Sequence, residues 1–249
     1  MLPHGPRDVA VQFLFFALAY AAYELVRGLV AVDGSTPFAN ATRIIELERS
    51  LHVFVEPRVQ AWVSGHAHWL LLAADWSYLN AHFALTLGAL CFIYLRRNDS
   101  FATVRNGFLV AMAIALFGYA LYPTAPPRLM PQYGFQDSVR QFTGIDAQRG
   151  AGGLLINPYA AIPSMHVCFA LLIALPMAAL VRHRLARILW RCYPAFIVFV
   201  VIVTANHYFT DVLLGILTAA LSLRLAPRVE LPARAASLRL RRSLGLFSA

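Results

Sequence analysis

Two short segments carry the residues whose types and spacing could perform group-transfer chemistry. "PSMH" (163–166) and "NHYFTD" (206–211) each stand at the start of an apolar run. His207 and Asp211 are four residues apart, so on a helix they share one face, where the carboxylate can accept the Nδ1–H of the imidazole. The second ring nitrogen is then left as a nucleophile. His166, two residues into its own predicted helix, is placed to donate or accept a proton.

Two further groups would hold an anion beside these residues. Ser164 follows a proline at a predicted helix start, where a capping hydroxyl and free N–H groups bind anions. Arg128 ends the segment "YPTAPPR" (122–128), and its guanidinium offers a fixed fork to phosphate oxygens. Together these residues supply a nucleophile, a carboxylate that orients it, an imidazole that acts as acid and base, and groups that bind an anion. This combination indicates phosphoryl transfer through a phosphohistidine.

Each of these residues also has an ordinary structural explanation. Ser164 alone would be a helix cap, and Arg128 alone a solvated surface charge. His207 and Asp211 could form a helix-stabilising pair worth about 0.2–0.5 kcal/mol, and His166 could be an interfacial histidine. The catalytic interpretation is favoured because ionisable groups at membrane depth are costly. Their spacing matches no zinc signature, and a haem would not explain the arginine or the serine, so we expect no metal and no cofactor.

The elements that must position these residues are predicted to lie in a membrane. The chain has 249 residues, of which 59% are hydrophobic and 13% charged, whereas soluble domains average about 45–50% and about 25%. This composition indicates an all-α integral membrane protein without a separate soluble domain. The net charge of +9 comes from arginines that lie between apolar runs, so a bilayer explains it better than nucleic acid. The arginine-rich, lysine-free usage points weakly to a bacterial source. The cysteines are predicted to be small buried hydrophobes, neither disulfides nor metal ligands; they are Cys91, Cys168 and Cys192.

Residues 1–226 are predicted to form a single six-helix membrane domain. The run from 190 to 226 is too long for one crossing, so we place a break at "TAN" (204–206). The first apolar run is interpreted as a retained span, not a signal peptide, because little charge precedes it. Each of the six runs is near the ~20 residues that a ~30 Å hydrocarbon core requires. The runs are 9–26, 78–95, 104–122, 164–181, 190–204 and 207–226.

The distribution of arginine predicts that both termini are cytoplasmic. With the N-terminus inside, the cytoplasmic segments hold fourteen arginines and three acidic residues, whereas the external segments hold seven arginines and nine acidic residues. All the candidate catalytic residues then fall at the external face of the plasma membrane. The basic tail, 227–249, is predicted to be a cytoplasmic stop-transfer flank.

Two external segments are too long to be simple turns. In 27–77, apolar residues recur at helical spacing with charges between them, which indicates an amphipathic helix lying on the outer membrane surface. Residues 66–76 ("HAHWLLLAADW") are too short to span and are predicted to be interfacial or re-entrant. Residues 123–163 are rich in proline and glycine and lead directly into "PSMH", so they are predicted to form the active-site loop; their arginines are Arg128, Arg140 and Arg149.

The segments "YPTAPPR", "PSMH" and "HYFTD" resemble, in order and spacing, the three signature blocks of the type 2 phosphatidic acid phosphatase superfamily. The resemblance covers roughly 78–226 and implies a six-helix membrane fold with metal-independent chemistry. It implies that His207 is the nucleophile and Asp211 its partner. It implies further that His166 protonates the leaving group and that Arg128 with Ser164 binds phosphate.

Departures from that pattern point to one branch of the family. Leu121 stands where the family has Lys, and Val200–Val201 where it has Ser-Arg; Leu129 and Met165 replace Pro and Gly. Two phosphate-binding cations are therefore absent, which argues against a generic lipid phosphatase. The blocks instead resemble the inositol phosphorylceramide synthase branch, whose members move a phospho-headgroup between lipids.

That branch also has a motif similar to "YLNAHF" (78–83). The resemblance makes Tyr78 and His82, with Asn206 of the third block, candidate headgroup contacts. The alternative is that the aromatic residues only anchor the chain at the membrane interface.

Three functions remain open from the sequence. The leading hypothesis is a phosphotransferase that takes inositol phosphate from phosphatidylinositol and passes it to an alcohol, a glycan or a ceramide-like lipid. A diester donor carries one negative charge, which fits a site with few cations better than a dianionic monoester does. The alternatives are a phosphatase of phosphatidate or polyprenyl (pyro)phosphate, and a non-catalytic lipid-binding or transport protein. The sequence does not indicate the oligomeric state.

Overall fold

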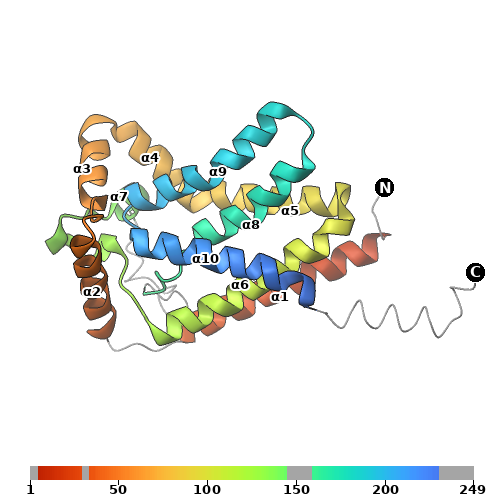
Figure 1. Ribbon diagram of the computed structural model, residues 1–249, viewed down its shortest axis with the longest axis horizontal. Coiled ribbons are helices and arrows are strands. Elements are labelled where there is room, and N and C mark those ends of the chain that lie inside the picture. Colours follow the sequence, from red (N-terminus) through yellow and green to blue (C-terminus); the bar gives the residue numbers. More distant parts are fainter. Residues whose placement is uncertain (1–4, 30–33, 145–158, 230–249) are drawn as a thin grey trace, which may run out of the picture.

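The computed structural model describes residues 5–29, 34–144 and 159–229, and helices dominate them (Figure 1). The predicted all-α fold is confirmed: in this part of the chain the only β pairing is an isolated bridge between Thr124 and Ala160. Within these described ranges, five helical stretches are long and apolar enough to cross a membrane, which indicates a multi-pass membrane protein. They are Gly5–Gly28, His68–Arg96, Asn98–Leu121, Arg184–Val203 and Phe209–Arg228. The remaining apolar helix, Met165–Leu180, is shorter, so the count of six spans stays a prediction.

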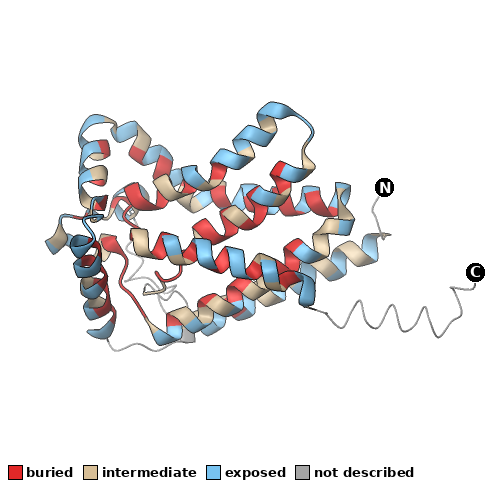
Figure 2. Cartoon of the chain, viewed as in Figure 1, coloured by how far each residue is buried: buried red, intermediate tan, exposed pale blue. Residues whose placement is uncertain are grey.

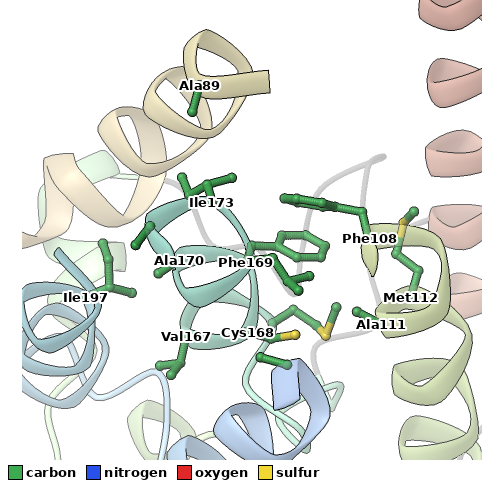
Figure 3. Close-up of a cluster of buried hydrophobic side chains, with 14 of the residues drawn as sticks. Ala89, Phe108, Ala111, Met112, Val167, Cys168, Phe169, Ala170, Ile173 and Ile197 are labelled. Carbon is green, nitrogen blue, oxygen red and sulfur yellow. The ribbon is translucent and has the colours of Figure 1, made fainter. Parts of the chain in front are cut away.

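One apolar helix forms the centre of the bundle. This is α8 (Met165–Leu180), and it packs against four others, α5 (His82–Arg96), α6 (Asn98–Leu121), α9 (Arg184–Val203) and α10 (Phe209–Leu225). A helix that is apolar on all sides is stable only when neighbours surround it. Figure 3 shows Phe169 and Ile173 of α8 among side chains of these neighbours, with the Phe169 and Phe108 ring centroids 4.7 Å apart.

Figure 2 shows that the outer faces of the helices are exposed, and many of the exposed side chains are large and hydrophobic. Phe13, Phe117 and Trp69 are each more than two-thirds exposed. An apolar surface this extensive is covered by lipid in a membrane protein. The prediction of buried cysteines was wrong for Cys91 and Cys192, which lie on this outer surface, and right for Cys168.

Three short helices cover one end of the bundle. They are α2 (Thr36–Ser50), α3 (Glu56–His66) and α7 (Ser138–Thr143). The start of α1 (Gly5–Leu29) and the end of α10 lie at the opposite end (Figure 1). Sequence predicted one amphipathic helix where the structure has α2 and α3. The break falls at 51–55, where His52 adopts a positive φ of 59° that a helix does not allow, and Pro57 lies in the first turn of α3, where a proline is tolerated. Whether these helices lie on a membrane surface stays a prediction.

The prediction of a separate interfacial segment at 66–76 was wrong. Helix α4 (His68–Trp76), the π-helical segment η1 (Ser77–Ala81) and α5 form one continuous helix of 29 residues. No proline interrupts it, and its acidic residue is accommodated by a hydrogen bond, because Asp75 accepts one from the Ser138 hydroxyl at 2.8 Å. The predicted break at 204–206 is confirmed, since α9 ends at Val203 and α10 begins at Phe209.

Two predictions concern residues that lie wholly or largely outside the described part of the chain. Arg149 of the predicted active-site loop is one. The other is the basic tail, of which the structure describes only the beginning, including the end of the short helix η5 (Ala226–Arg228).

Candidate active site

A cavity of about 160 Å³ brings together segments that are far apart in the sequence. That volume is many times the ~10–15 Å³ that one water needs. Its walls come from α1, η1 and α5, α6, the loop after α6, α8 and the turn before α10. Of the predicted site residues, those that line it are Arg128, His166, His207, Tyr78, His82 and Asn206.

His207 and Asp211 form the predicted pair. His207 Nδ1 lies 3.2 Å from Asp211 Oδ2, and this oxygen also accepts the Tyr208 N–H at 3.0 Å. The prediction that both residues lie on one helix was wrong, because His207 precedes α10 and Tyr208 is its cap. The contact forms nonetheless, since Asp211 in the first turn reaches back over the cap. Nδ1 is thereby occupied, and His207 has Nε2 to present to the cavity that it lines.

Two buried glutamates anchor the start of α10 from outside the bundle. Glu56 accepts the Phe209 N–H at 3.1 Å, and Glu48 accepts the N–H and the hydroxyl of Thr210 at 2.7 and 2.8 Å. Both side chains accept N–H groups that the first turn of a helix leaves without a partner inside the helix. Burial, with the neighbouring Glu48, raises the pKa of Glu56 to about 8. The sequence interpretation treated both glutamates as charges on the polar face of a surface helix and missed this role.

His166 is the second residue of α8 and faces His207, with 6.1 Å between ring centroids. Its ring stacks on Tyr78 at 4.2 Å, and it hydrogen-bonds the Tyr78 backbone. Tyr78 lies in the π-helical segment η1, and such segments often occur at functional sites. Among the described residues, Nε2 of His166 is buried with no hydrogen-bond partner. The ring is therefore fixed from one side with a nitrogen left for a ligand.

Ser164 ties the two helix starts together. It stands at the N-cap position of α8, as predicted, but its hydroxyl makes no capping hydrogen bond; its N–H donates to the Asp211 carbonyl at 3.0 Å. Its hydroxyl is fully buried with no partner in the described part of the chain. Ser164 does not line the cavity, so its predicted contact with phosphate stays a prediction.

Two glycines let neighbouring helices approach this cap closely. A Cβ on Gly215 of α10 would lie 2.5 Å from the Ser164 carbonyl oxygen, and one on Gly118 of α6 would lie 2.9 Å from the Ile162 carbonyl oxygen. Both distances are shorter than side chains tolerate. The segment that carries "PSMH" is therefore seated between two helices at positions that only glycine permits.

Arg128 is positioned by the turn that precedes His207. Its backbone N–H donates to the Ala205 carbonyl at 2.7 Å, and its Nη1 lies 3.6 Å from Asp137 Oδ2. Its Nε is buried and has no hydrogen-bond partner within residues 5–29, 34–144 and 159–229. A guanidinium held in this way retains a donor for an anion in the cavity.

The candidate headgroup contacts differ in what they leave available. His82 shares a hydrogen bond between Nδ1 and the Tyr193 hydroxyl at 2.9 Å, and its Nε2 is buried with no partner among the residues described. Asn206 donates its amide hydrogens to the carbonyl and hydroxyl of Thr204. It therefore holds the turn, and only its amide oxygen remains for a ligand. In the described ranges, no three His, Cys, Asp or Glu side chains lie close enough to hold a metal ion.

The sequence interpretation missed a group of cavity residues near the end of α1. Tyr20, Tyr23, Glu24 and Arg27 of α1 and Tyr119 of α6 all line the cavity. The available signal was "ELVR" at the end of the first apolar run, which places a carboxylate and a guanidinium three residues apart at membrane depth.

The comparison with protein families settles the relationship that these blocks predicted. The model of the PAP2 superfamily matches residues 42–225, which include all three blocks. The chain belongs to the PAP2 superfamily. The match begins after α1, so the cavity residues of α1 lie outside the matched range.

A curated relative supports a particular branch of the PAP2 superfamily. The chain is 26% identical over 239 residues to a phosphoinositol dihydroceramide synthase of Bacteroides thetaiotaomicron, covering 86% of this chain and 75% of the relative. No solved structure matches the chain. Family and relative together support an inositol phosphorylceramide synthase-like assignment and a membrane enzyme of the phosphatase or phosphotransferase type.

Proposed function

We propose that this protein is a membrane phosphotransferase that moves inositol phosphate from phosphatidylinositol to an alcohol acceptor through a phosphohistidine on His207. One observation carries the proposal. His207, held by Asp211 at Nδ1, shares a cavity with His166, whose Nε2 is buried without a partner among the described residues, and their ring centroids lie 6.1 Å apart. Buried polar groups are normally hydrogen-bonded, so an unpaired one facing a cavity indicates a ligand.

The first half of the reaction forms the intermediate. Nε2 of His207 attacks the phosphorus of the donor diester, and the bond from phosphorus to the diacylglycerol oxygen breaks. Protonated His166 gives that oxygen its proton, so diacylglycerol leaves as an alcohol. The Asp211 carboxylate stabilises the positive charge that develops on His207. Arg128 directs Nε toward the phosphate oxygens.

The second half reverses the roles. His166, now neutral, takes the proton of the incoming alcohol, whose oxygen attacks the phosphorus of the intermediate. The bond to Nε2 of His207 breaks, and a new phosphodiester forms. If water entered in place of the alcohol, the same steps would hydrolyse the headgroup, so exclusion of water distinguishes a transferase from a phosphatase.

The proposed site would face the outside of the cell. The arginine-rich segments that are predicted to be cytoplasmic include the connection between α8 and α9 and the connection between α5 and α6. To test this, cysteine is introduced at exposed Ser50 of α2 and a membrane-impermeant maleimide is added to whole cells. We expect labelling of this variant and none of the matched variant at exposed Arg96.

The function is tested by product analysis. Purified protein receives phosphatidylinositol labelled in its headgroup, with a long-chain alcohol as acceptor. We expect a labelled phosphodiester of that alcohol, unaffected by EDTA and lost in His207→Ala. Release of inorganic phosphate from monoester lipids, with no diester formed, would support a phosphatase. Unchanged transfer by His207→Ala would refute catalysis at this site.

A further inference from the structure

A cluster of polar side chains projects into the cavity from the end of α1. Arg27 Nη2 lies 2.9 Å from Glu24 Oε2, and the Tyr23 hydroxyl donates to the Tyr119 hydroxyl of α6 at 3.1 Å. Tyr20 completes the cluster through a hydrogen bond with Glu24. All five residues line the same cavity as His166, His207 and Arg128, which is the site already described.

Packing does not explain this cluster. Most of α1 faces outward, and Tyr23 is the one buried side chain among those described in this helix. A carboxylate and a guanidinium are costly at membrane depth, where they mark functional sites. Arg27 Nε is buried with no partner in the part of the chain that the structure describes. The cluster therefore retains hydrogen-bonding capacity that points to a polar ligand.

We propose that Glu24, Arg27 and the three tyrosines form a subsite that binds the hydroxyl groups of a polyhydroxylated phospho-headgroup. The inference rests on the proposed function and names the part of the cavity that would distinguish such a donor from lipids with small headgroups. A carboxylate accepts hydrogen bonds from hydroxyls, a guanidinium donates to them, and a phenol does both. An acyl chain would offer no partner to the buried Arg27 Nε. Arg27 also gives the cavity a second guanidinium besides Arg128. The positions at which the family has Lys and Arg are Leu121 and Val201 in this chain, and neither lines the cavity.

The subsite is tested with two donors that share a phosphodiester and differ in hydroxyl groups, phosphatidylinositol and phosphatidylethanol. The measured quantity is the ratio of their kcat/KM values. We expect Glu24→Gln to lower this ratio about 10- to 100-fold, the loss of one or more hydrogen bonds to a charged group. The matched control is Glu46→Gln on the exposed face of α2, away from the cavity, with an unchanged ratio. A Glu24→Gln ratio within twofold of the wild type would overturn the proposal.

A binding measurement separates this proposal from the proposed function. Thermal unfolding in detergent is recorded with inositol 1-phosphate and with ethyl phosphate. We expect inositol 1-phosphate to raise the unfolding temperature of the wild type more than ethyl phosphate does. In Glu24→Gln and Arg27→Lys the two compounds should raise it equally. Without ligand, both variants should unfold at the wild-type temperature. Preferential binding without any transfer would refute the proposed function and retain the subsite. Transfer from phosphatidylinositol with equal binding of the two compounds would refute the subsite and retain the function.

Discussion

Replacement of Gly215 by alanine perturbs the active site without touching a catalytic group. The added Cβ would lie 2.5 Å from the Ser164 carbonyl oxygen, about 0.9 Å nearer than the 3.4 Å at which ordinary contact begins. A backbone carbonyl cannot turn aside as the end of a side chain can. Ser164 also accepts the Cys168 N–H in the first turn of α8. The start of α8 must therefore move away from α10, and His166 moves with it.

The magnitude follows from opposing contributions. Alanine is favoured over glycine inside a helix by about 1 kcal/mol, whereas forcing a methyl group into a packed contact costs about 1–3 kcal/mol. We therefore expect Gly215→Ala to be destabilised by about 0–2 kcal/mol. The effect on activity should be larger, because a displacement of about 1 Å between reacting groups costs roughly 10²-fold in rate.

The assay is headgroup transfer by purified protein together with thermal unfolding in detergent. The matched control is Gly88→Ala, another helical glycine, whose added Cβ would meet nothing within 4 Å. We expect the control to keep full activity and to unfold at the same or a higher temperature. Wild-type activity in Gly215→Ala would refute the inference that the close contact between α8 and α10 sets the separation of the two histidines.

Three further predictions concern buried carboxylates. Asp211→Asn should lower kcat about 10²- to 10⁴-fold with intact folding, because the amide cannot stabilise the charged imidazole; single-turnover kinetics and circular dichroism check this. Because the pKa of Glu56 is raised to about 8, the folded protein keeps this proton where the unfolded chain has lost it, so wild-type stability should fall as the pH rises from about 5 to about 8. Glu56→Gln should flatten that pH dependence in thermal unfolding. An unchanged slope would contradict this prediction. Ser138→Ala should cost about 1–3 kcal/mol, since Asp75 loses its hydroxyl donor, and thermal unfolding at equal activity measures it.

Much of the site could be predicted because its residues occur in local patterns. The contact between His207 and Asp211 depends on a four-residue spacing, and the start of α8 directly after Ser164 follows from the proline before it. The break at 204–206 follows from the length of a membrane span. Each of these predictions needs only a few consecutive residues and the physics of a helix in a bilayer.

What could not be predicted depends on packing between distant segments. From the sequence, Glu48 and Glu56 were predicted to be charges on the polar face of a surface helix, yet they are buried against the start of α10. Arg27 lies about a hundred residues upstream of Arg128 but lines the same cavity. Residues 66–76 were separated from the helix over 68–96 because they are too short to span a membrane alone. The hydroxyl of Ser138 that accommodates Asp75 lies in α7, about sixty residues downstream, where a local pattern cannot place it.

The most direct test of the proposed mechanism is to trap the covalent intermediate. Purified protein is mixed with phosphatidylinositol labelled at phosphorus, without acceptor, quenched rapidly, and its peptides are analysed by mass spectrometry. We expect the labelled phospho-headgroup on His207 alone, and its loss when an alcohol acceptor is added before the quench. Transfer that proceeds at the normal rate with no labelled protein, or with label on His166 instead, would contradict the mechanism.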